Sequence, residues 1–233
     1  MFESQKHVFW QALLATILIF GIGLLLGYAL ESARTTKVAN QCASSEIDIM
    51  DMRIQGDVLS IEKANCEKVI EENIKFADRI YEEAKTLEKY QTASKLSEEI
   101  SLEHKRYDLL RTLIWINSIN IRSSCNASYH NIIYLYKNND PSIDERTKQS
   151  IFATFLQELK DKWGNEIMLV PIAADSGLAS LNILLKTYNV TEFPTILVDE
   201  KLKVESVEDL IKVEQYLQAN SFSSNNASNK TVA

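Results

Sequence analysis

The chain has 233 residues, of which 45% are hydrophobic and 24% are charged, and its formal net charge is −7. An acidic protein repels the phosphates of nucleic acids, so the composition argues against a nucleic-acid-binding function. Six glycines and three prolines exclude collagen-like and linker-dominated chains. About a tenth of the chain is one apolar block near the amino terminus, which leaves about 200 residues for one or two folded domains.

Residues 8–30, which follow a short amino-terminal flank at 1–7, form an apolar segment without a charge. As a helix this segment would be about 34 Å long, enough to cross a bilayer. Phe9, Trp10 and Tyr28 lie near its two ends, where aromatic rings favour the membrane interface. We interpret residues 8–30 as a transmembrane helix in contact with lipid.

Small residues in this segment leave two further interpretations open. Gly23 and Gly27 form a GxxxG motif, through which two membrane helices can pack closely, so a homodimer is possible. Gly27 and Ala29 also have the spacing of a signal-peptide cleavage site. A cleaved signal peptide is therefore the alternative to a retained anchor, although its apolar core is usually about 7 to 15 residues long.

The charges that flank the segment do not settle its orientation. Lys6 precedes it and Arg34 and Lys37 follow it. We predict a single-pass membrane protein whose large domain lies outside the cytoplasm, because a short amino-terminal flank is typical of signal anchors and the cysteines fit that location. Four glycosylation sequons also suit an outside location, but the Asn and Ser content produces such sequons by chance; they begin at Asn126, Asn189, Asn226 and Asn229.

A polar linker at 31–45 is followed by residues 46–125, which contain no proline and one glycine, Gly56. Apolar residues recur at helical spacing in two stripes, over 58–87 and 96–121, and the weaker stretch 89–94 separates them. The pattern predicts an antiparallel helical hairpin that acts as a stalk, with a dimeric coiled coil as the alternative. Residues 109–121 are apolar nearly all round, so we expect the second helix to pack also on the next domain.

The hydrophobic period changes after residue 130, and we predict a domain over 126–219, followed by a disordered polar tail at 220–233. Strands are predicted at 131–138 and 167–175, with two more joined by a tight turn at 194–204; helices are predicted at 142–164, 178–188 and 208–217. A capping box of Ser142 and Glu145 opens the first of these helices. The long crossover implies a parallel strand pair and the hairpin adds antiparallel strands, which indicates an α/β fold.

The stretch KTYNVTEFPTILVDEK at 186–201 resembles the corresponding part of thioredoxin-fold proteins. In both, a helix ends, a few residues intervene, and a proline starts a strand that turns back as a hairpin. The resemblance covers residues 131–219 and implies a thioredoxin-like fold in which the Phe193–Pro194 peptide bond is cis.

The chain departs from the redox members of that superfamily at the position that carries their chemistry. Those members have Cys-x-x-Cys directly after the strand that corresponds to 131–138, whereas this chain has NNDPSI at 138–143. Without a thiol there, dithiol exchange cannot occur at this position. We therefore predict a cleft that binds an extended peptide or an unknown protein partner, bordered by Asn138, Asn139, Asp140, Phe193, Pro194 and Thr195.

Three cysteines, Cys42, Cys66 and Cys125, contain no CxxC pair, and no paired histidines accompany them, so we predict no metal site. Outside the cytoplasm two of the three should pair. We favour Cys66 with Cys125, which would close a loop of about 60 residues and stabilise the fold by about 4 kcal/mol. Cys42 with Cys66 is the competing pair.

The remaining candidates for chemistry are isolated in the sequence. His7, His104 and His130 have no nucleophile or carboxylate at a catalytic spacing, and no phosphate-binding glycine motif occurs, so we assign no catalytic residue and no cofactor. The sequence thus predicts a membrane-anchored, redox-inactive thioredoxin-like binding or scaffolding protein. A structural stalk protein of a membrane complex and an atypical thiol-disulfide oxidoreductase using Cys66 or Cys125 are the alternatives.

Overall fold

The structure is a computed structural model that describes residues 3–59, 65–91, 97–125 and 127–221. The end of the turn predicted at 89–94, most of the predicted tail, and the sequons at Asn126, Asn226 and Asn229 lie outside these ranges. The chain divides into two compact units, residues 1–51 and residues 52–233.

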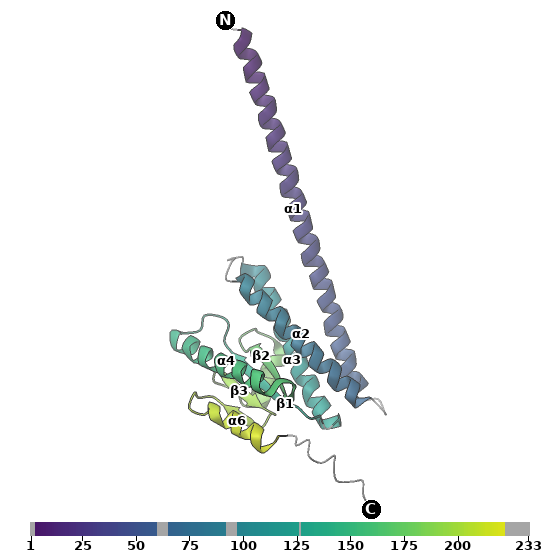
Figure 1. The fold of residues 1–233 in the computed structure, drawn as a ribbon, viewed down its shortest axis with the longest axis vertical. Helices are drawn as coiled ribbons and strands as arrows, with labels where there is room; N and C mark the ends of the chain where they lie inside the picture. Colours follow the sequence, from purple (N-terminus) through teal and green to yellow (C-terminus); the bar gives the residue numbers. More distant parts are fainter. Residues whose placement is uncertain (1–2, 60–64, 92–96, 126, 222–233) are drawn as a thin grey trace, which may run out of the picture. The chain divides into compact units, whose positions relative to one another are not determined.

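The first unit consists of helix α1, which extends over Glu3–Val58 and so continues into the start of the second unit (Figure 1). Within the described residues, α1 contains the one stretch that is long and apolar enough to cross a membrane, Phe9–Leu30, with a mean hydropathy of 2.4. Residues 31–45, which we predicted as a linker, are helical. No glycine or proline occurs between residues 28 and 55, so nothing in the sequence interrupts the helix there.

Helices α2, Cys66–Gln91, and α3, Ser97–Cys125, follow in the second unit. The stripe that we predicted as one helix from residue 58 to 87 is instead divided between Val58 and Cys66. Asn65 explains the new start: its Oδ1 accepts a hydrogen bond from the Lys68 N–H at 3.1 Å, and its carbonyl accepts one from the Val69 N–H at 3.0 Å. This is the pattern of an N-cap residue.

Four strands form one sheet in the order β2-β1-β3-β4, with β1 at His130–Tyr136, β2 at Ile167–Ala173, β3 at Thr195–Val198 and β4 at Leu202–Val204. Strand β1 is parallel to β2 and antiparallel to β3, and β3 is antiparallel to β4. Three helices alternate with the strands: α4 at Ile143–Trp163, α5 at Ala179–Thr187 and α6 at Leu210–Ala219; a short 3-10 helix, η1, spans Gly164–Glu166. The predicted mixed α/β architecture is confirmed.

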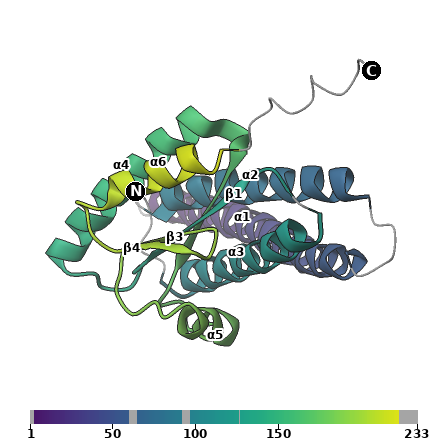
Figure 2. The same cartoon turned by 90° about the horizontal axis from the view of Figure 1, so that it is seen from below.

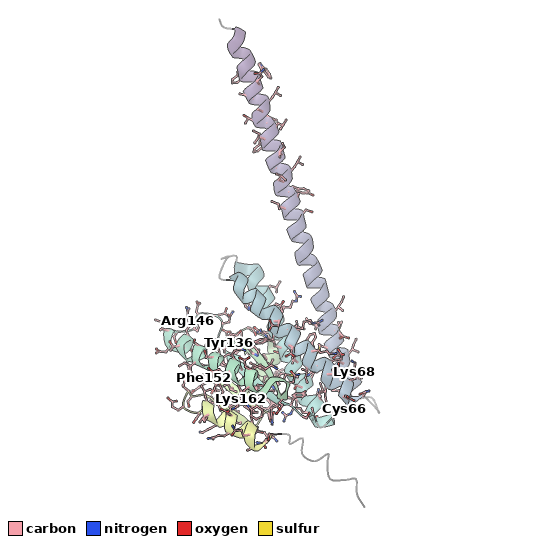
Figure 3. All side chains as sticks on the ribbon, in the orientation of Figure 1. Cys66, Lys68, Tyr136, Arg146, Phe152 and Lys162 are labelled. Atoms are coloured by element: carbon pink, nitrogen blue, oxygen red, sulfur yellow. A yellow bond between two sulfur atoms is a disulfide. The ribbon has the colours of Figure 1, made fainter. Side chains whose placement is uncertain are left out.

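Helices cover both faces of the sheet, with α4 and α6 on one face and α3 and α5 on the other (Figure 2). Alternate residues of β1 point to opposite faces. Ile132 and Tyr134 belong to a buried cluster with Phe152 of α4, which Figure 3 labels, and Val213 of α6. Helices α2 and α3 contact each other and both contact β2. Helices α2 and α3, which belong to the stalk that we predicted at 46–125, therefore pack on the sheet within the second unit.

Candidate functional site

The sheet register brings the two predicted binding segments to one end of the sheet. Leu135 near the end of β1 pairs with Thr195 at the start of β3, and the Phe193–Pro194 peptide bond just before it is cis. Strand β2 ends at the same side, because Tyr136 pairs with Ala173. Residues 138–142, which follow β1, and residues 193–195 therefore border this end, which we call the loop end.

The backbone of the 138–142 loop is held by a single carboxylate, that of Asp175, which follows β2. The Asn139 N–H donates to Oδ2 of Asp175 at 2.7 Å, and the Asn138 N–H donates to both carboxylate oxygens at 3.0 and 3.1 Å. The side-chain amide of Asn139 also donates to the Asp175 carbonyl at 3.3 Å. Asp140 has a φ of 44°, in the left-handed region that aspartate tolerates better than most residues.

The start of α4 stabilises the other side of this loop. Ser142 and Glu145 form the predicted capping box, in which the Ser142 N–H donates to Glu145 at 2.8 Å and the Glu145 N–H donates to Ser142 Oγ at 3.2 Å. The Lys137 ammonium lies 2.6 Å from Glu145, and its hydrogen bond, with those of Ser142, lowers the pKa of Glu145 to about 2. Next to this rigid turn, the side chain of Ile143 is 83% exposed.

The second segment of the loop end is largely buried. Pro194 and Thr195 are buried, and Phe193 is half-buried. The Thr195 hydroxyl donates to the Glu192 carbonyl at 2.5 Å, so it serves the local turn. Phe193 is therefore the most accessible residue of the three at 193–195.

The loop end presents exposed polar groups and some apolar surface. Residues 138–141 and 193–195 contain no thiol and no imidazole. In the described part of the chain no group of three or more His, Cys, Asp or Glu residues has the geometry to hold a metal ion. The exposed side chains of Asn138 and Asn139 carry amide groups, and Ile143 and Phe193 add apolar surface. Such a surface suits an extended peptide that offers backbone hydrogen bonds and apolar side chains.

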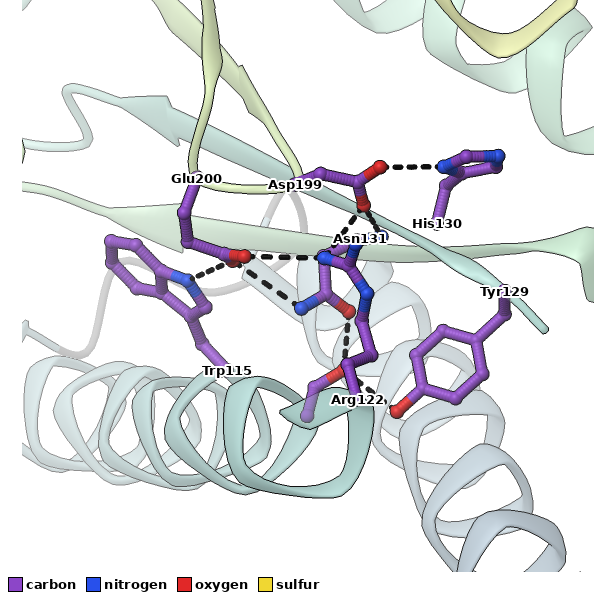
Figure 4. A network of polar contacts seen from close by, with 8 residues as sticks. Trp115, Arg122, Tyr129, His130, Asn131, Asp199 and Glu200 are labelled. Carbon is purple, nitrogen blue, oxygen red and sulfur yellow. Dashed lines mark hydrogen bonds and ion pairs between the residues drawn. The ribbon is translucent and has the colours of Figure 1, made fainter. Parts of the chain in front are cut away.

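The opposite end of the sheet carries a polar network that the sequence did not reveal (Figure 4). We call it the turn end, because its centre is the β3–β4 turn, where Asp199 and Glu200 both have positive φ values. Arg122 of α3 lies 2.8 Å from Asp199 and 3.2 Å from Glu200. The Trp115 indole N–H donates to Glu200 at 2.9 Å. These contacts attach α3 to the β-hairpin.

The start of β1 completes the network. His130 Nδ1 lies 2.6 Å from Oδ2 of Asp199, and the Asn131 N–H donates to Oδ1 of Asp199 at 2.9 Å. The Ser118 hydroxyl donates to Oδ1 of Asn131, and it lies 2.9 Å from the Tyr129 hydroxyl, from which its oxygen accepts a hydrogen bond. His130, which we judged isolated in the sequence, thus contacts a carboxylate 69 residues away.

The turn end is a network of largely buried polar side chains. His130 and Asp199 are 2% and 4% exposed. Burial raises the pKa of Glu200, against the hydrogen bonds from Trp115 and Asn131 and the nearby charge of Arg122. A histidine at the start of a strand and an acidic pair in a hairpin turn are also common surface features, so sequence spacing gave no signal of this pairing.

A second buried carboxyl, Asp108 of α3, lies at the loop end. It is 2% exposed, and its Oδ1 accepts a hydrogen bond from the Ala173 N–H at 3.0 Å. Arg111, one turn further along α3, lies 3.5 Å away. Asp108 therefore attaches α3 to the end of β2, an edge strand. Pro171 has no backbone N–H, and Asp108 occupies the N–H of Ala173. Strand β2 is therefore poorly suited to pair with another strand at its free edge.

The structure joins Cys66 and Cys125, with a Cα–Cα distance of 5.3 Å. This disulfide links the start of α2, where Figure 3 labels Cys66, to the end of α3. Cys125 precedes β1 and the 138–142 loop follows it, so seven strand residues, about 23 Å, separate these sites along the sheet. The disulfide is therefore not part of the loop end.

The predicted membrane-packing residues lie in α1. At Gly23 and Gly27 an added Cβ would meet no heavy atom within 4 Å. Their GxxxG face is open in the first unit, and packing through it stays a prediction.

No protein-family model matches the chain, and neither does any curated protein. Among solved structures, thioredoxin O2 from Arabidopsis thaliana in its oxidised state is similar, with 16% sequence identity and a TM-score of 0.33. The similarity covers 46% of this chain and 86% of that protein. The comparisons do not assign the chain to a family.

Proposed function

We propose that this protein is a membrane-anchored, redox-inactive thioredoxin-like module that binds an extended peptide or a partner protein at the loop end of its sheet. The observation that carries the proposal is the register of β1 and β3, in which Leu135 pairs with Thr195. It sets the cis bond of Phe193–Pro194 beside the loop that follows β1. This is the arrangement that the sequence resemblance implies for the ligand-binding end of a thioredoxin-like domain.

The positions of the cysteines support binding without thiol chemistry. Two of the three cysteines form a disulfide between α2 and α3, and neither lies in the loop that follows β1. Redox exchange needs a thiolate that a substrate can reach at a site shaped for it. The loop that would occupy that position consists of Asn138, Asn139, Asp140 and Pro141.

The same disulfide supports an extracytoplasmic location for the second unit. Disulfides persist in oxidising compartments and are rare in the reducing cytoplasm. With residues 8–30 retained as an anchor, the protein would be single-pass with residues 52–233 outside. Protease treatment of sealed inside-out vesicles tests this arrangement: the second unit should be protected until detergent opens the vesicles, and cleavage of intact vesicles would contradict it.

Peptide binding is tested by selecting displayed peptides on the full-length protein in lipid nanodiscs. Affinities of the selected peptides are then measured for the wild type and for Phe193→Ala. Loss of an aromatic contact at the centre of an interface should weaken binding roughly 10- to 100-fold. Ile211→Ala is the matched control, because Ile211 is an aliphatic residue of α6 that is 54% exposed.

Three outcomes would contradict the proposal. Either no peptide is selected above background, or Phe193→Ala binds as tightly as the wild type, or both variants lose affinity equally.

An insulin-reduction assay tests the proposed lack of redox activity. The wild type should reduce insulin no faster than a variant with Cys66→Ser and Cys125→Ser. Cysteine-dependent turnover would favour an oxidoreductase instead.

A further inference from the structure

The sequon at Asn189 lies in the segment that joins α5 to β3, within the described part of the chain. A sequon is often a chance match in sequence, but the fold shows whether its asparagine can carry a sugar. We propose that Asn189 carries an N-linked glycan, rooted on the side of the domain away from the loop end. The proposal rests on the extracytoplasmic location in the proposed function, because N-linked glycans belong to secreted and surface domains.

Both polar residues of the sequon are exposed, and the residue between them is buried. Asn189 and Thr191 are accessible to solvent, whereas Val190 is 5% exposed. A glycan is bulky and hydrophilic, so its asparagine must lie at the surface. The alternation meets that requirement and keeps the apolar residue of the sequon in the core.

The backbone of Asn189 is fixed, and its side-chain amide takes no part in fixing it. Asn189 follows the last turn of α5 and has a φ of 52°, in the left-handed region that asparagine tolerates better than most residues. Its N–H donates to the Lys186 carbonyl at 3.2 Å, and its carbonyl accepts a hydrogen bond from Nζ of Lys203 at 2.9 Å. A glycan attached to the side chain therefore disturbs neither of these bonds.

The modification replaces one N–H bond of the Asn189 amide with a bond to carbon. Nδ2 attacks the anomeric carbon of an oligosaccharide that is carried on a lipid phosphate. The bond between that carbon and the phosphate oxygen breaks, the lipid phosphate leaves with the electron pair, and a base of the transferase takes the proton from Nδ2. Because the backbone of Asn189 is bonded on both sides in the fold, the acceptor is the chain before this segment folds.

Neighbouring contacts place Asn189 away from the loop end. The ring centroids of Tyr188 and Trp115 are 5.4 Å apart, and the Trp115 indole belongs to the turn end (Figure 4). Lys203, which binds the Asn189 carbonyl, belongs to β4, the strand at one edge of the sheet. The glycan is therefore rooted near the turn end and this edge, and peptide binding at the loop end should not depend on it.

The test is mass spectrometry of the full-length protein, purified from the membranes of the cells that produce it. Trypsin cuts after Lys186 and Lys201, so residues 187–201 form one peptide with a single sequon. We expect this peptide to carry an added mass that breaks up into sugar units on fragmentation.

Variants of the sequon identify the attachment site. Thr191→Ala should remove the added mass and Thr191→Ser should retain it, because the sequon needs a hydroxyl at that position. Asn189→Asp should also remove it, since aspartate tolerates the left-handed backbone but has no amide to modify. Thr187→Ala changes an exposed threonine outside the sequon and is the matched control, which should keep the added mass.

The proposal is overturned if residues 187–201 are recovered only without added mass. It is also overturned if the added mass persists in Thr191→Ala or Asn189→Asp, or if Thr187→Ala loses it. Protease protection in inside-out vesicles reports the location separately: an unmodified peptide from a protected domain rejects the glycan alone, and one from an accessible domain rejects the extracytoplasmic location as well. Selection of peptides at the loop end depends on neither result.

Discussion

Gly56 is the residue at which the smallest change should have a clear effect on packing. A Cβ added there would lie 2.7 Å from Oδ1 of Asn117, whose Nδ2 donates to the Met52 carbonyl at 2.8 Å. In Gly56→Ala the Asn117 side chain must move and its hydrogen bond weakens. We expect the free energy of unfolding to fall by about 1 to 2 kcal/mol, measured by urea denaturation of the full-length protein.

A double-mutant cycle separates this clash from the effect of alanine on the helix itself. Asn117→Ala removes the obstacle, so Gly56→Ala should cost less in that background than in the wild type. Equal costs in both backgrounds would show that Gly56 and Asn117 do not interact.

The sequence predicted correctly those contacts and turns whose residues lie close together along the chain. The Ser142 and Glu145 box lies within four positions, and Pro194 stands directly before an apolar run. His130 and Asp199 are 69 positions apart, and only the pairing of β1 with β3 brings them together. Likewise, Asp175 is 36 and 37 positions away from the backbone amides that it binds, and only the structure brings them together.

At the scale of elements, α3 depends on the ion pairs that attach it to the hairpin. Arg122→Ala would leave Asp199 and Glu200 buried together without their cation. Removing one partner of a buried charge cluster is strongly destabilising, so we expect a loss of about 3 kcal/mol in thermal or urea unfolding. Lys212→Ala, which removes an exposed ion pair with Asp209, is the control and should cost less than about 1 kcal/mol.

Neutralising the acids tests the cause of that loss. Arg122→Ala combined with Glu200→Gln should recover part of the stability, because the amide still accepts a hydrogen bond from Trp115 and one buried charge is gone. A combined variant less stable than Arg122→Ala alone would contradict this account of the network.

The elements after residue 130 were predictable because strands and helices of one domain differ clearly in hydrophobic period. The elements before residue 130 were harder to predict. All of 31–45 has helix-compatible composition, so a polar linker and a continued helix have the same sequence signal. The break between Val58 and Cys66 depends on one capping residue, Asn65, in a chain rich in asparagine.

For the whole molecule, the perturbed carboxyls predict maximal stability at mildly acidic pH. The folded pKa of Asp108, about 6, lies above its ordinary value of 3.8, so its contribution is lost as the pH rises through 6, by about 3 kcal/mol. Glu200 acts in the same direction. The pKa of Glu145 is lowered, so its contribution is lost as the pH falls below about 4.5.

Urea unfolding between pH 3 and 7 measures this profile, and the free energy of unfolding should be highest near pH 4 to 5. Asp108→Asn should flatten the decline between pH 5 and 7. A wild-type stability that rises steadily from pH 5 to 7 would disagree with the assigned burial of Asp108.

The disulfide between Cys66 and Cys125 contributes to stability through the long segment that it closes, with a sequence separation of 59. Cys66→Ser with Cys125→Ser should lower the free energy of unfolding by about 4 kcal/mol. Alkylation followed by mass spectrometry of the unreduced protein should modify one cysteine per chain. Modification of all three would show that the bond does not form in the isolated protein.

Polar side chains attach helix α3 to the sheet at two places: Asp108 at the loop end, and Arg122, Trp115 and Ser118 at the turn end. Advancing a helix by one residue moves each side chain by 1.5 Å and turns it by about 100°. A one-residue shift of α3 in either direction would thus separate these side chains from their hydrogen-bond and ion-pair partners at once. Leucine, isoleucine and valine can replace one another in the intervening layer at modest cost. The alignment of α3 should therefore survive extensive aliphatic redesign of that layer, provided that these polar side chains are kept.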